Sequence, residues 1–239
     1  MEIRSDDPYL VHQWVLAAIA SAAARFIPLP FVDDMVRTRS RQFAVARTLA
    51  AHGYDYSSGD LAPLYGGMSG SLASKLFRKV TSVPMKLALF PIRKLVRIFG
   101  SVRGVPLDLM ETILIARTLD RCIDRGLFEP AAESKERERQ AAEVRGAFDE
   151  AFDGIDWLAV KSVTSDTMEQ LRHWGGATTE LAQQVFAKDQ TDPDRLAVDP
   201  LANDEEVAAG AAKVEAMLQQ PETMQLMATF DRRFDAALA

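Results

Sequence analysis

Apolar residues recur along the chain with the spacing of α-helices, and prolines and glycines divide them into segments. The first segment runs from Pro8 to Ala24 without a formally charged residue, directly after two aspartates. An acidic cap followed by proline predicts a helix that starts here and continues to about Phe26. Because the run is short and rich in alanine, we interpret it as a buried core helix, with a membrane-inserted helix as the alternative.

The helical period continues through the rest of the sequence, and no stretch favours a β-strand. Further helices are expected over residues 33–52, 71–82, 84–103, 108–125, 131–152, 168–188, 204–219 and 222–238. Either Asp33 or Asp34 is expected to cap the second helix, and Asp108 stands near the start of another. The stretch 155–163 predicts no more than one helical turn. We therefore expect an all-α protein, a bundle of about 8–10 helices with hairpins broken by proline.

Charge is divided unevenly along the chain. Residues 1–126 hold 17 Lys and Arg against 11 Asp and Glu, whereas residues 127–239 hold 11 against 23. Such asymmetry indicates that the two halves have different roles or contact each other. We expect a basic helical-hairpin domain over 1–128 and an acidic helical domain, or an extension packed on the first, over 129–239.

The stretch between Leu61 and Leu107 contains no acid and is rich in both basic and large apolar residues. Its basic residues form the candidate site for an anionic surface, and they are Lys75, Arg78, Lys79, Lys86, Arg93, Lys94, Arg97 and Arg103. Between Pro84 and Arg103, three of them share one helical stripe, while apolar side chains fill a wide opposite face. This pattern is typical of a basic amphipathic helix, and it predicts a partner such as anionic lipid, nucleic acid or an acidic protein surface.

The residue types that usually carry catalysis or bind metals form no defensible motif here. Cys122 is the single cysteine, which excludes a disulfide within the chain, and we expect it to be a buried structural thiol. The acid-rich stretch 189–204 lacks the spacing of a calcium loop, and the glycine-rich stretch 66–71 lacks the lysine of a phosphate-binding loop. Glu133 and Arg137 have the spacing of an ion pair on a solvated helix face. We expect a non-enzymatic protein with no cofactor and no metal.

One family resemblance rests on two similar segments. Residues 27–34, followed by an arginine-rich helix that ends at His52 and Gly53, show a proline–acid–long-helix–glycine pattern, and residues 105–108, followed by a helix that ends at Gly126, echo it. Over residues 26–128 the chain resembles helical, membrane-associated bacterial domains of poorly known function, namely the EcsC family and the helical domain appended to some Era-like GTPases. The resemblance implies a helical-hairpin protein at or near a membrane, and it supplies no catalytic residues.

A second resemblance is to the helix-turn-helix of TetR-type regulators. Residues 41–53 would be the first helix, 53–55 the turn, 60–66 the second helix, and 70–72 would open the recognition helix. The resemblance implies that Lys75, Arg78 and Lys79 lie near DNA phosphates, and that the acidic second half is a ligand domain.

The basic stretch favours a non-enzymatic helical protein that associates peripherally with anionic membrane through residues 75–103. We expect it in the cytoplasm, at the inner face of the membrane. One alternative is a protein-interaction or scaffold module whose basic segment docks on an acidic surface, either its own second half or a partner's. The other alternative is a TetR-like DNA-binding regulator.

Overall fold

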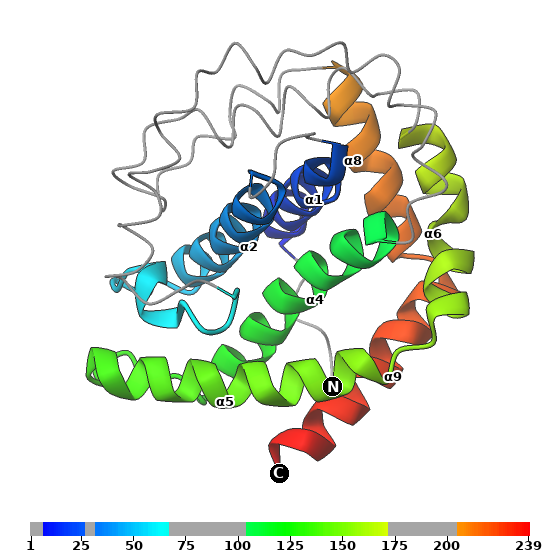
Figure 1. The fold of residues 1–239 in the computed structure, drawn as a ribbon. Helices are drawn as coiled ribbons and strands as arrows, with labels where there is room; N and C mark the ends of the chain where they lie inside the picture. The colour runs from blue at the N-terminus through cyan, green and yellow to red at the C-terminus, as the bar shows by residue number, and fades with distance from the viewer. Residues whose placement is uncertain (1–6, 27–31, 67–103, 172–204) are drawn as a thin grey trace.

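The computed structural model describes residues 7–26, 32–66, 104–171 and 205–239, which are mainly α-helical (Figure 1). The helices are α1 (Pro8–Ala23), the 3-10 helix η1 (Ala24–Phe26), α2 (Val32–Ala51), the 3-10 helix η2 (Ser58–Leu61), α4 (Gly104–Asp124), α5 (Ser134–Asp153), α6 (Trp157–Leu171), α8 (Glu205–Leu218) and α9 (Pro221–Leu238). These ranges contain no strand, so the expectation of an all-α fold is confirmed. The helices expected over 71–82 and 84–103, and most of the one over 168–188, lie outside the described residues.

α1 is the central helix, and α2, α4 and α8 pack around it (Figure 1). The Asp7 side chain accepts a hydrogen bond of 2.9 Å from the Tyr9 amide, and a proline occupies the first turn, as the sequence indicates. Twelve of the 16 residues of α1 are buried, which confirms the predicted core helix. Trp14 Nε1 donates to Thr48 Oγ1 at 2.9 Å, so the only polar atom of the tryptophan side chain has a partner inside the core. Within the described ranges, no helix has the length and apolar character needed to cross a bilayer.

A second apolar core lies between α5, α9, η2 and the C-terminal part of α4. Phe148 of α5 and Phe230 and Phe234 of α9 are fully buried there. The rings of Phe148 and Phe230 meet edge to face with centroids 5.2 Å apart, a favoured aromatic geometry. Both cores contain residues from before and after residue 128, so the described helices on the two sides of that position pack together.

Two helices start earlier than the sequence predicts. α2 begins at Val32, so Asp33 and Asp34 lie in its first turn instead of capping it. α4 begins at Gly104, four residues before Asp108, and it includes a proline in its first turn. Proline is tolerated there because a first-turn N–H has no partner within the helix. The acids that looked like caps are therefore available for other contacts.

Glycine ends two helices as predicted, while α6 is longer than predicted. Gly53 and Gly126 have φ angles of 70° and 72°, the left-handed conformation that terminates α2 and α4. α6 spans 15 residues where we expected a single turn. The Asp156 side chain accepts a 2.9 Å hydrogen bond from the Leu158 amide and marks the start of α6, a capping signal that the sequence reading missed.

A ladder of ion pairs connects α4 with α9. Arg117, Arg121 and Arg125 recur every four residues on α4, and Asp231 and Asp235 have the same spacing on α9. The outer two arginines each approach one aspartate at 2.7 Å, and the central arginine contacts both. Part of the charge difference between the two halves of the sequence is therefore neutralised inside the fold.

Candidate functional site

The eight basic residues of the predicted site all lie in the stretch 67–103, outside the described residues, so the structure does not test them. We call this stretch the basic segment; it carries a net charge of +8. The described residues, which we call the helical body, hold 16 Lys and Arg against 26 Asp and Glu, a net charge of −10. The strongest charge contrast in the chain is thus between the basic segment and the helical body.

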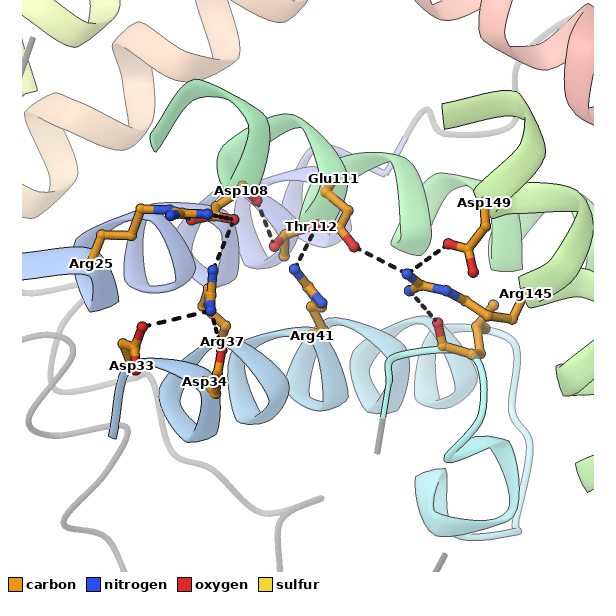
Figure 2. A network of polar contacts seen from close by, with 11 residues as sticks. Arg25, Asp33, Asp34, Arg37, Arg41, Asp108, Glu111, Thr112, Arg145 and Asp149 are labelled. Atoms are coloured by element: carbon orange, nitrogen blue, oxygen red, sulfur yellow. Dashed lines mark hydrogen bonds and ion pairs between the residues drawn. The ribbon is translucent and has the colours of Figure 1, made fainter. Parts of the chain in front are cut away.

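A network of charged side chains lies between α2, α4 and α5, near the points where the basic segment leaves and rejoins the helical body (Figure 2). Figure 2 shows side chains of α2 pointing toward α4, with one arginine entering from η1 and another from α5. We call this the flank network, and its members are Arg25, Asp33, Asp34, Arg37, Arg41, Asp108, Glu111, Arg145 and Asp149.

Asp108 is the centre of the first half of the flank network. It is 3% exposed, and its carboxylate accepts hydrogen bonds from Arg25, one of them 3.1 Å long from Nη2. Arg37 Nη1 lies 3.5 Å from the same carboxylate, and Arg37 also pairs with Asp34. Burial works to lower the pKa of Arg37, but Asp108 and Asp34 outweigh it and the pKa is raised. The buried carboxylate is therefore held by two permanent positive charges.

Glu111 organises the second half, one turn further along α4. Its carboxylate accepts from Arg41 Nη2 at 2.6 Å and from Arg145 Nη2 at 3.3 Å. Arg145 also lies 2.7 Å from Asp149 and donates through Nη1 to the Leu64 carbonyl at 3.1 Å. Burial lowers the pKa of Arg41, although Glu111 opposes the shift, and a guanidinium pKa starts so high that the group stays charged.

The side chains of the flank network hold one another through ion pairs. Each of its carboxylates pairs with an arginine, and the network contains no cysteine or histidine that could act as nucleophile or proton shuttle. In the part of the chain that the structure describes, no three His, Cys, Asp or Glu side chains are arranged to hold a metal ion. The ion pairs hold α2, α4 and α5 against one another.

Arg137 does not form the ion pair with Glu133 that the spacing predicts. Its Nη2 instead lies 2.8 Å from Asp60 Oδ2, and its guanidinium stacks on the Tyr56 ring at 4.2 Å from the centroid. The long-range partner comes from the segment around η2, which sequence spacing within α5 cannot reveal. A cation held against an aromatic face and a carboxylate outweighs an exposed pair along one helix.

The region around η2 also differs from the TetR-type pattern. That resemblance requires an α-helix over 60–66, whereas the structure has the four-residue 3-10 helix Ser58–Leu61 followed by turns. The preceding helix is 20 residues long and begins at Val32, well before the start expected at residue 41. The rest of the proposed DNA-reading unit lies in the basic segment.

Cys122 is buried as expected, and burial raises the pKa of its thiol to about 12 from the ordinary value of 9.0. The folded chain therefore keeps this proton at a pH where the unfolded chain loses it. We expect this group to make the free energy of unfolding fall as the pH rises from about 9 towards 12.

At neutral pH a chromogenic thiol reagent should react with the buried Cys122 only as fast as the protein unfolds. Immediate stoichiometric labelling of the native protein would contradict this.

Comparison with family models, with curated proteins and with solved structures gives no match for this chain. The resemblances proposed from the sequence therefore stay predictions. The fold and the charges define an all-α protein whose acidic helical body adjoins a strongly basic segment.

Proposed function

We propose that this is a non-enzymatic protein that binds peripherally to anionic membrane through its basic segment, on the cytoplasmic side. The observation that carries the proposal is the charge division, +8 in residues 67–103 against −10 in the helical body. Apolar residues interspersed with the basic ones, such as Ile92 and Phe99, would enter the interface while Lys and Arg meet the lipid head groups. Each basic residue near the surface would contribute about 1 kcal/mol.

The helical body supports giving this role to the basic segment, because most of its own arginines already have acidic partners. Nine of them form ion pairs with carboxylates: Arg25, Arg37, Arg41, Arg117, Arg121, Arg125, Arg137, Arg139 and Arg145. An anionic surface would have to break those pairs to recruit them. Repulsion between the acidic body and such a surface is screened beyond about 8 Å at physiological salt, so a separate basic segment can still bind.

A second candidate function is docking of the basic segment on an acidic protein surface. The observation that favours it is the presence of several exposed acids on α5, including Glu138, Glu150 and Asp153. Such a surface attracts a segment of charge +8 whether it belongs to the same chain or to a partner.

Co-sedimentation with lipid vesicles at low and high salt tests the proposal. We expect the protein to bind vesicles of anionic lipid and not those of neutral lipid, with part of the binding surviving high salt because apolar contacts are not screened. Complete loss at high salt together with binding to DNA would favour the regulator, since counterion release makes DNA binding steeply salt-dependent. Absence of binding to both kinds of vesicle would refute membrane association and leave the protein-docking function.

A further inference from the structure

The last described helix, α9, packs chiefly against α5 and much less against α8, which directly precedes it in the sequence (Figure 1). Phe230 and Phe234 of α9 are fully buried, and the Phe230 ring meets Phe148 of α5 with the centroids 5.2 Å apart. Burial of these rings is the main apolar gain that holds α9 in place. The contacts that stabilise α9 therefore come from helices far from it in the sequence.

The charged contacts of α9 lie on α4, in the ion-pair ladder. Arg117 and Arg121 each approach Asp231 at 2.7 Å, and Arg125 approaches Asp235 at 2.7 Å. The side chains of the first three residues are at most 15% exposed. A like charge in place of either aspartate would therefore be strongly unfavourable, so the ladder selects the helix that can dock here.

The connection between α8 and α9 is short and exposed. α8 ends at Leu218 and α9 begins at Pro221, so Gln219 and Gln220 are the whole connection, and both are exposed. Gln220 has φ −69° and ψ 141°, the extended conformation that a following proline favours. Pro221 thereby keeps α8 and α9 from joining into one continuous helix.

Recognition of α9 does not depend on this connection. We call Phe148 and the three arginines of the ladder the α9 docking surface; it recognises phenylalanines and aspartates that each recur after four residues on α9. The α9 of a second chain carries the same residues at the same spacing, so it can make the same contacts. Exchange of an identical element between two copies is a low-cost route to a dimer, and short connections favour it.

We propose that the α9 docking surface also accepts α9 from a second copy of the chain, so that two copies exchange this helix and form a dimer. The connection holds the chain's own α9 near its docking surface at an effective concentration on the order of 1 mM. The chain is therefore a monomer when dilute. Exchange becomes favourable when the chain concentration approaches that value, or when the connection is altered to direct α9 away from its own body. This inference does not rest on the proposed membrane binding.

Two full-length variants with reversed charges test the exchange. The surface variant is Arg117→Glu/Arg121→Glu/Arg125→Glu, and the helix variant is Asp231→Arg/Asp235→Arg; each places like charges against one another within a single chain. When the two are unfolded together and refolded, exchange of α9 restores opposite charges at both docking surfaces of the mixed dimer. We expect a 1:1 dimer, detected by light scattering, whose midpoint of unfolding in denaturant lies above that of either variant alone. A chain with all five changes is the control, and it should fold as a monomer.

Pro221→Ala tests the connection without changing any charge. Alanine lets Gln219 and Gln220 become helical, so α8 and α9 can join into one helix that directs α9 away from its own docking surface. We expect this variant to be a dimer at a concentration where the wild type is a monomer, with the amide of residue 221 protected from hydrogen exchange. Pro8→Ala, the same replacement in the first turn of α1, is the matched control and should remain monomeric.

Each outcome decides the question. Absence of a 1:1 dimer from the mixture, while the chain with all five changes folds as a monomer, would overturn the exchange. If that chain does not fold, Pro221→Ala decides alone: a dimer with a protected amide at residue 221 would support the exchange, and a monomer or an unprotected amide would overturn it. Failure of vesicle binding would leave the exchange untouched, because neither measurement involves lipid.

Discussion

Replacing Asp108 with alanine is expected to lower the free energy of unfolding by about 3 kcal/mol. The carboxylate is almost completely buried and lies between Arg25 and Arg37, so its removal takes the buried counter-charge from both guanidinium groups and leaves Arg37 only the more exposed Asp33 and Asp34. The effect stays at the lower end of the range for buried pairs because the Arg25 side chain is 31% exposed and can turn toward water. Denaturant-induced unfolding followed by circular dichroism measures the loss.

Asp149→Ala provides the control for this prediction. Asp149 also pairs with an arginine of the flank network, Arg145, but its side chain is 53% exposed. Exposed pairs contribute about 0.2–1 kcal/mol, so this variant should lose less than about 1 kcal/mol. Equal losses in the two variants would show that burial does not set the strength of the network.

The double variant Arg93→Glu/Arg97→Glu is expected to weaken binding to anionic vesicles by about two to three orders of magnitude. Each reversal removes an attraction of about 1 kcal/mol and adds a repulsion of similar size, about 4 kcal/mol in total. If the basic segment contacts lipid instead of the helical body, the free energy of unfolding of the body should change little. Affinity is measured by titrating vesicles of fixed anionic content at constant salt.

Lys135→Glu/Lys161→Glu is the matched charge control. Both lysines are exposed on the helical body, on α5 and α6, and the pair changes the net charge by the same amount. A general effect of net charge would weaken both double variants alike. Binding through the basic segment predicts a large loss for the arginine variant and a small one for the lysine variant.

The sequence predicts the helices well where local signals act. Pro8 and its aspartate cap fix the start of α1, and Gly53 and Gly126 fix two helix ends, because these residues impose backbone geometry on their own neighbours. The uninterrupted apolar run correctly predicts that α1 is buried, since a helix that is apolar all round needs partners on every side.

The flank network could not be predicted from the sequence in the same way. Asp108 looks like a helix cap by position, but α4 starts at Gly104 and the carboxylate instead meets Arg25, 83 residues away in the chain. Local spacing carries no information on such contacts, because they depend on how α2 and α4 pack. The available signal was indirect: Arg37 and Arg41 lie four residues apart, on one face of a helix that is otherwise mostly buried.

The charge asymmetry offered contact between the two halves as one of two explanations, and ion pairs between described residues show that such contacts form. Arg117 and Arg125 of the first half do meet Asp231 and Asp235 of the second. The partner of the basic segment itself is a separate question, since the helical body retains a net charge of −10 after its internal pairs are formed. Exposed acids of the helical body could attract the basic segment, so docking within the chain is a testable alternative to membrane binding.

A polarity-sensitive dye on a single cysteine shows most directly which part of the chain meets the membrane. In a Cys122→Ser background, the dye is attached at Leu95→Cys in the basic segment or at Glu150→Cys, an exposed position on α5. On addition of anionic vesicles, we predict a blue shift and increased emission from the dye at position 95 and no change at position 150. No change at position 95, or an equal change at both positions, would contradict membrane binding through the basic segment.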